Sequence, residues 1–246
     1  DGGEMSNPQP LEEEVYDMSG ARLALILCVT KAREGSEEDL VALENMFQQL
    51  GFESTTKRDP TAQQFQEELD KFQQAMDART DPISCGFVVL MAHGREGLLK
   101  GEDEQMVKLE NLFEVLNNKN CLALRAKPKV YIVQACRGDQ KDPGEIIPGD
   151  DILMVSEDNA ETIPTYTDIL HVYATVEGYI AYRHDQEGSC FIQILVDVFT
   201  KKKGPILELL TEVVRRMAEK ELVQGGKMRK VNPEIQSTLR KRLYLQ

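Results

Sequence analysis

Short, continuous apolar runs recur along the chain, and they constrain its fold more strongly than any other feature. They lie at 22–30 (RLALILCVT), 85–92 (CGFVVLMA), 129–135 (KVYIVQA) and 168–176 (DILHVYATV). Runs of this length are typical of β-strands that are covered on both faces. Stretches with helical periodicity lie between them. This alternation predicts an α/β fold in which a mostly parallel sheet carries helices on both faces.

The predicted helices are defined by their apolar spacing. In 39–51, Leu40, Leu43, Phe47 and Leu50 share one face, and Gly51 is expected to end the helix. In 59–79 the apolar face is Phe65, Leu69, Phe72 and Met76, with Asp59 as the expected cap and Pro60 in the first turn. Further helices are expected at 109–117, at 189–202 with Ser189 as cap, and at 205–224. Weaker extended segments are expected at 52–58, 178–183 and 237–246.

The 246 residues are enough for one large domain or two small ones. We predict one catalytic domain preceded by a flexible leader at 1–17, which is polar, acidic and unlike a signal peptide. A second change of texture lies at 139–163, where prolines, glycines and acidic residues indicate an exposed linker. The linker separates a part at 18–138 from a part at 164–246.

Composition excludes several classes of function. The formal net charge of −13 repels phosphates, so nucleic acid is not an expected partner, and the basic cluster at 227–230 is expected to be a solvated loop. No apolar run approaches the roughly 18 residues that a membrane span needs. The five cysteines form no CxxC pair and are odd in number, which argues against a disulfide framework and a structural zinc site. This usage fits a reducing compartment, so we expect a cytoplasmic protein, with the nucleus as a second location.

Two of the predicted strands end in residues that can carry chemistry. The run at 85–92 is followed by His93 and Gly94, and the run at 129–135 by Cys136, Arg137 and Gly138. Ligand sites of open parallel sheets lie beyond the carboxyl ends of the strands. If the two strands are neighbours, an imidazole meets a thiol there and can take its proton. The amides of Gly94 and Cys136 can then hold the oxyanion of a tetrahedral intermediate.

The remaining cysteines and histidines have simpler interpretations. Cys28, Cys85 and Cys121 lie in or near apolar stretches and are expected to be core residues. His171 falls within a strand pattern and His184 in a polar turn, so a structural or solvated role is expected for both.

The segment 134–138 (QACRG) matches a signature of the caspase family, whose histidine lies upstream of the cysteine. Other segments also resemble the family: MAHGREG resembles its histidine loop, GYIAYR its substrate-binding stretch, and GSCFIQ the helix start that follows. The resemblance runs from about Asp17 to Gln246. It implies a cysteine endopeptidase with Cys136 as nucleophile, His93 as the proton-handling base, no metal and no cofactor.

The resemblance also implies cleavage after aspartate. Caspases bind that carboxylate with two arginines and a glutamine, and the matching positions here are Arg33, Gln134 and Arg183. An arginine fork suits a carboxylate and stays charged, which also argues against relatives that prefer basic residues. Ala181 and Tyr182 stand where the family commonly has Ser-Trp; Tyr182 keeps an aromatic wall and Ala181 keeps its backbone groups.

Position 190 is a further departure from the family. Some members have tryptophan where this chain has Cys190, and the loss of that ring implies a changed pocket for the P4 side chain. A larger or more hydrophobic P4 residue is therefore expected.

The family also implies a zymogen that is cut in the linker. Asp150, Asp151 and Asp158 are the candidate processing positions, but none lies in a family cleavage tetrapeptide, so another protease is expected to cut. The last strand is expected at the sheet edge, where it pairs with a second copy in a homodimer. Expected substrates are proteins with exposed Asp-containing loops, and the resemblance suggests a role in differentiation of epidermal cells.

Alternatives remain open from the sequence. One is a caspase-shaped regulator that binds partners and cleaves little. Another is a flavodoxin-like ligand-binding domain, which predicts a phosphate-binding glycine loop after the first strand; the segment VTKAREGSEED is too acidic and poor in glycine for that. A papain-type protease is disfavoured because its cysteine precedes its histidine.

Overall fold

The computed structural model describes residues 14–137, 163–175, 188–224 and 226–246. Their centre is a six-stranded sheet in the order β11-β8-β7-β3-β1-β2. Every neighbouring pair is parallel except β11 and β8. The strands are β1 (Ala21–Cys28), β2 (Glu53–Arg58), β3 (Ile83–Met91), β7 (Lys129–Gln134), β8 (Ile169–Tyr173) and β11 (Glu234–Ser237).

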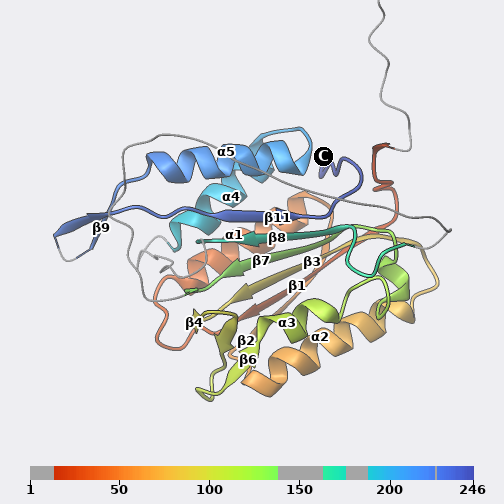
Figure 1. The fold of residues 1–246 in the computed structure, drawn as a ribbon, viewed down its shortest axis with the longest axis horizontal. Helices are drawn as coiled ribbons and strands as arrows, with labels where there is room; N and C mark the ends of the chain where they lie inside the picture. The colour runs from red at the N-terminus through yellow and green to blue at the C-terminus, as the bar shows by residue number, and fades with distance from the viewer. Residues whose placement is uncertain (1–13, 138–162, 176–187, 225) are drawn as a thin grey trace, which may run out of the picture.

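Helices cover both faces of this sheet (Figure 1). One face carries α1 (Ser36–Gln49), α4 (Cys190–Lys201) and α5 (Ile206–Glu219), and the other carries α2 (Ala62–Asp77) and α3 (Leu109–Glu114). Each face of the sheet has its own hydrophobic core: the first core lies beneath α1, α4 and α5, and the second beneath α2 and α3. In β1, Ala24, Ile26 and Cys28 belong to the first core, and Leu23, Leu25 and Leu27 belong to the second. A strand with two buried faces must be apolar at consecutive positions, and this confirms the predicted α/β fold class.

Smaller elements surround the sheet. An antiparallel sheet of β4 (Gly94–Arg95), β5 (Leu98–Lys100) and β6 (Met106–Lys108) follows β3, and a 3-10 turn lies at Leu122–Leu124. A hairpin of β9 (Leu222–Gln224) and β10 (Lys227–Arg229) follows α5. These strands are too short to show periodicity in the sequence, and we did not predict them. The basic cluster at 227–230, expected to be a loop, belongs mostly to β10.

Several predicted helix boundaries are wrong. The helix expected at 39–51 begins at Ser36, and the helix expected at 109–117 ends at Glu114. The helix expected at 205–224 ends at Glu219, because its apolar stripe stops at Met217 and the polar residues Lys220 and Glu221 leave nothing to bury. Asp59 does not cap α2. Thr61 is the N-cap, with its hydroxyl accepting from the amide of Gln64 in a capping box, while Asp59 accepts the amide of Thr30.

The strand expected at 237–246 is also misplaced. The edge strand β11 lies at Glu234–Ser237, so only one residue is shared with the prediction. Beyond it the chain forms isolated bridges, such as Val15 with Arg242, and buries Leu243 and Leu245 in the first core. Alternating apolar residues here pack beneath the helices instead of extending the sheet.

Other predictions are confirmed. Gly51 follows α1 with φ +78°, and the Ser189 hydroxyl accepts the amide of Ile192 at the start of α4. Within the described ranges, no helix combines the length and apolar character that crossing a membrane requires. Residues 1–13 of the leader predicted at 1–17, most of the linker, and the extended segment at 178–183 lie outside the described residues. Tyr16, within the predicted leader, is buried and donates to Asp168, so a flexible leader does not reach residue 17.

Candidate active site

The catalytic pair predicted from the sequence lies at the ends of two neighbouring strands. β3 and β7 pair in parallel, with Met91 opposite Gln134. His93 comes two residues after Met91, and Cys136 comes two residues after Gln134, so both follow the sheet at the same edge. His93 is exposed and Cys136 is partly exposed, which leaves both within reach of a ligand.

Gly94 shows how closely these two segments approach. A Cβ atom at this position would lie 2.9 Å from the carbonyl oxygen of Cys136 and 2.7 Å from that of Leu98. Both distances are shorter than carbon–oxygen contacts allow, so only glycine fits. The backbones after β3 and β7 therefore approach one another closely at Gly94 and Cys136.

A backbone carbonyl holds the histidine ring. The Nε2 atom of His93 lies 3.1 Å from the carbonyl oxygen of Ala32, in the loop after β1. Because a carbonyl can only accept, Nε2 must carry the proton, and in the neutral ring Nδ1 is left as the base. Ala32 has φ +54°, a left-handed conformation that costs a non-glycine residue about 1 kcal/mol. The loop thus holds a strained residue where it meets the catalytic pair.

Two residues predicted to bind a carboxylate are buried at this edge. Arg33 follows Ala32, is 2% exposed, and donates from Nη1 to the carbonyl of Val29 at 2.9 Å. Gln134 ends β7 and is also 2% exposed, and its Oε1 has no hydrogen-bond partner among the described residues. A buried amide side chain normally has partners, so Gln134 is suited to a ligand that completes its hydrogen bonds.

Arg137, the arginine of the signature, has a role that we did not predict. It is 7% exposed, donates to the Thr175 carbonyl at 3.0 Å and lies 3.2 Å from a carboxylate oxygen of Glu234. Its guanidinium stacks at 3.7 Å over the ring of Tyr173. Through these contacts Arg137 connects the chain segment that carries Cys136 to β8 and to the edge strand β11. A lone arginine beside a cysteine carries no sequence signal for such contacts.

Three cysteines, Cys28, Cys85 and Cys121, are buried in the core, as predicted. Burial raises the pKa of Cys28 to about 11 and the pKa of Cys85 and Cys121 to about 12. These thiols stay protonated at neutral pH and are poor nucleophiles. His171 is likewise structural: its ring stacks on Phe113 with centroids 4.0 Å apart.

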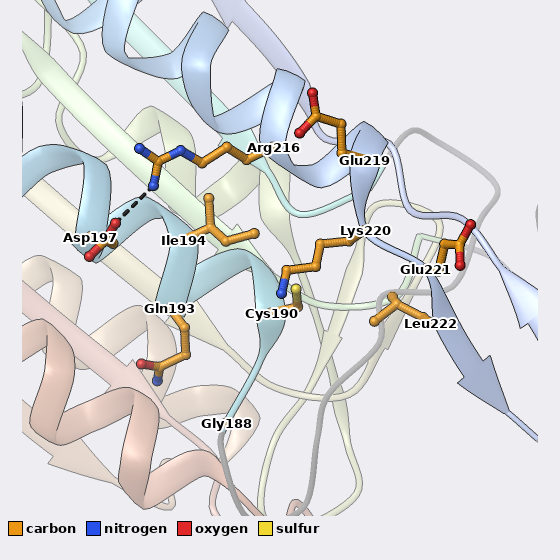
Figure 2. Close-up of a pocket in the computed structure, with 10 residues that line it drawn as sticks. All are labelled: Gly188, Cys190, Gln193, Ile194, Asp197, Arg216, Glu219, Lys220, Glu221 and Leu222. Atoms are coloured by element: carbon orange, nitrogen blue, oxygen red, sulfur yellow. Dashed lines mark hydrogen bonds and ion pairs between the residues drawn. The ribbon is translucent and has the colours of Figure 1, made fainter.

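Cys190 lines a pocket of about 650 Å³ between the start of α4 and the end of α5 (Figure 2). Ile194 and Leu222 supply apolar walls, while Lys220 extends toward Cys190. At the far side, the guanidinium of Arg216 pairs with Asp197 at 2.8 Å. The pocket therefore has apolar walls from Ile194 and Leu222, with the charged Lys220 close to Cys190.

Several predicted residues lie outside the described part of the chain. These are Ala181, Tyr182 and Arg183 of the substrate-binding stretch, His184, and the processing positions Asp150, Asp151 and Asp158. For these residues the roles remain predictions.

The chain belongs to the caspase family: the family model described as a caspase domain matches residues 21–244. It is therefore a caspase-type protease, a cysteine endopeptidase. It is 82% identical to Caspase-14 of Homo sapiens over 242 residues, which cover 98% of this chain and 100% of that protein. It is 68% identical to Caspase-14 of Mus musculus over 254 residues (99% of each chain) and 30% identical to Caspase-3 of Bos taurus over 249 residues (94% and 88%). These similarities favour the protease over the caspase-shaped regulator.

Proposed function

We propose that this protease hydrolyses peptide bonds after aspartate, with Cys136 as nucleophile and His93 as its base. The observation that carries the proposal is the pairing of Met91 with Gln134, which brings the imidazole and the thiol to one edge of the sheet, near the buried side chains of Arg33 and Gln134. Family membership supports the reaction class, and the burial of Arg33 and Gln134 supports the specificity.

The reaction proceeds in two halves. Nδ1 of His93 takes the thiol proton, and the Cys136 sulfur attacks the carbonyl carbon of the scissile bond. The oxygen becomes negative and accepts hydrogen bonds from the amides of Gly94 and Cys136. As the C–N bond breaks, His93 gives its proton to the leaving amine. Water, deprotonated by His93, then attacks the thioester and releases the acid and the thiol.

The P1 aspartate binds to Arg33 and Gln134, together with Arg183. An arginine fork stays charged and matches the geometry of a carboxylate, so it binds an anionic P1 aspartate better than a neutral asparagine. Tyr182 shapes the P2 pocket, and the backbone of Ala181 bonds to the peptide. The P4 side chain enters the pocket beside Cys190, where Ile194 and Leu222 favour a large apolar group.

We further propose that the protein is a cytoplasmic and nuclear zymogen with a role in epidermal differentiation. Cleavage in the linker, after Asp150, Asp151 or Asp158 or by another protease at a different bond, activates it. Two copies then pair through β11. This strand is at the end of the sheet order, and none of the described strands pairs with its outer edge.

The test is hydrolysis of a peptide library by protein cut in the linker, with and without a kosmotropic salt that strengthens burial and so dimer formation. Cleavage after Asp, absent after Asn and absent in Cys136→Ala, is expected. Selectivity for large apolar P4 residues would support the pocket beside Cys190. Failure to cleave any P1-Asp peptide under conditions where the protein is dimeric would overturn the proposal.

A further inference from the structure

A buried carboxylate lies between the loop of Arg33 and the start of α4. Asp39, on the first turn of α1, is 1% exposed. Its two oxygens accept the Ser189 amide at 2.9 and 3.0 Å, and Oδ1 also accepts from Nε2 of Gln193 at 3.0 Å. Carboxylates of a helix's first turn normally face water, so the burial of this one requires an explanation.

The contact with Asp39 also determines the residue before Ser189. Gly188 has φ +84°, and a Cβ atom there would lie 2.3 Å from Oδ1 of Asp39. Glycine is therefore required both by the backbone conformation and by the close approach of the carboxylate. Asp39 thus holds the chain at Gly188 and Ser189, five residues after Arg183 in the sequence.

The other side of Asp39 faces the loop of Arg33. The turn from Arg33 to α1 is short and well bonded: the Ser36 amide donates to the Arg33 carbonyl at 3.2 Å, and the Asp39 amide donates to the Gly35 carbonyl at 3.3 Å. Arg33 and Asp39 also attract one another electrostatically. The Asp39 carboxylate therefore interacts both with Arg33 and with Ser189, which follows Arg183 in the sequence.

Hydrogen bonding, rather than charge, dominates this arrangement. Burial raises the pKa of Asp39 to about 6, and the largest opposing effect is the hydrogen bond from the Ser189 amide, while the charge of Arg33 contributes least. Removing the negative charge would slightly strengthen the attraction of Arg33 for an anion. Losing the bonds to Ser189 and Gln193 is the larger effect, so the net result is weaker binding.

We propose that Asp39 is a positioning residue for recognition of the P1 aspartate, because it holds Gly188 and Ser189 in fixed relation to Arg33. This inference rests on the proposed function. The side-chain hydrogen bonds of Asp39 are to Ser189 and Gln193, neither of which belongs to β3 or β7, so Asp39 acts on substrate binding and leaves the thiol and imidazole in place.

The test compares Asp39→Asn with Asp168→Asn in linker-cleaved protein. Both carboxylates are buried, but Asp168 lies where β8 begins, at the opposite end of the sheet, and accepts from Tyr16 and Arg240. In Asp39→Asn, the amide oxygen can take the place of Oδ1, but the NH2 group then takes the place of Oδ2 and turns a donor toward the Ser189 amide. KM for a P1-Asp peptide should rise about fivefold or more, the effect of losing one binding hydrogen bond. The kcat and the rate of Cys136 alkylation by iodoacetamide, which needs no P1 side chain, should stay within about twofold.

The control should lower the unfolding temperature without changing KM. If Asp39→Asn does not fold, Gly188→Ala, whose Cβ displaces the same carboxylate, should raise KM in the same way. An unchanged KM would overturn this inference but not the proposed function. So would a rise in KM accompanied by equal falls in kcat and in the rate of alkylation. Wild-type protein that lacks selectivity for P1 Asp would instead overturn the proposed function and the inference together.

Discussion

Met91 and Gln134 lie opposite one another in the parallel pair of β3 and β7, and each is followed two positions later by a residue of the candidate catalytic pair. In parallel strands, residues at equal distances in sequence from a paired position lie at the same level along the strand direction. His93 and Cys136 therefore both follow the sheet at the same edge. The geometry depends on the register of two buried strands, which a one-residue slip would destroy. This explains how residues 43 positions apart (136 − 93) come to form one site.

Removing either member of the pair should abolish activity without unfolding the protein. Cys136→Ala should lower kcat/KM by roughly a thousandfold or more, and His93→Ala by about a hundredfold or more. Both side chains are at least partly exposed, so the free energy of unfolding should change by less than about 1 kcal/mol. Kinetics on a P1-Asp peptide and urea unfolding measure the two effects. Cys85→Ala, in the core, should show the reverse pattern; an active Cys136→Ala would assign the nucleophile elsewhere.

Gly94→Ala should reduce kcat with little change in the fold. The new methyl group would collide with the carbonyls of Leu98 and Cys136, and overpacking of this kind costs about 1–3 kcal/mol. Relief of the collision moves the Cys136 backbone and its amide, so kcat should fall about tenfold or more. Gly97→Ala is the matched control: it lies in the same hairpin, has φ +68° and has no atom within 4 Å of the new Cβ. If both variants lower kcat equally, backbone strain and not the collision is responsible.

The centre of the sheet could be predicted from the sequence because β1, β3, β7 and β8 are buried on both faces. Leu23 to Cys28 must all be apolar, and the resulting run stands out without any knowledge of the partner strands. The positions of His93 and Cys136 could be predicted for the same reason, since each directly follows such a run. Arg33 and Gln134 carry no periodic signal, and only the family resemblance indicated them.

Asp39 and Arg137 could not be predicted, because their partners are distant in the chain. Asp39 follows Glu37 and Glu38 in the first turn of α1, where carboxylates normally face solvent, and its burial depends on Ser189, 150 residues later. Arg137 contacts Glu234, 97 residues away. The short strands β9 and β11 were missed because their partners, and not their own composition, define them.

The Arg137–Glu234 pair should couple the segment of Cys136 to the edge strand energetically. Arg137 is nearly buried, and its loss removes the bond to Thr175 and the stacking on Tyr173 as well as the ion pair. Arg137→Met should cost about 2–4 kcal/mol of unfolding free energy, and Glu234→Gln less, because that carboxylate is partly exposed.

Urea unfolding of both single variants and the double variant measures the coupling. An interaction energy of about 1 kcal/mol or more is expected, whereas fully additive losses would show that the pair contributes nothing beyond its separate packing. Arg137→Lys is the informative third variant. Lysine keeps the charge but lacks the planar fork, so it should restore little of the lost stability.

His171 should make the fold less stable in acid. Burial lowers the pKa of this histidine to about 4, against the hydrogen bond with Gln236, which raises it. The unfolded chain takes up the proton near its ordinary pKa of about 6.5. Above that pH neither state is protonated and the stabilisation is fully present. As the pH falls from 6.5 to 4, only the unfolded state gains a proton, so the stabilisation is lost through this window.

The pH dependence of stability caused by His171 can be separated from that caused by Asp39. The raised pKa of Asp39 changes stability in the opposite direction over nearly the same pH range. Below its unfolded pKa of 3.8 the contribution of Asp39 is fully present, and it is lost as the pH rises to about 6. The two contributions therefore partly cancel in the wild-type chain. His171→Leu keeps an apolar contact with Phe113 and removes the contribution of the histidine. As the pH falls from 6.5 to 4.5, the free energy of unfolding of this variant should rise by roughly 2 kcal/mol relative to that of the wild type. Urea unfolding at half-unit steps tests this, with Asp39→Asn expected to shift the profile in the opposite direction; parallel profiles for all three proteins would show that neither group titrates on unfolding.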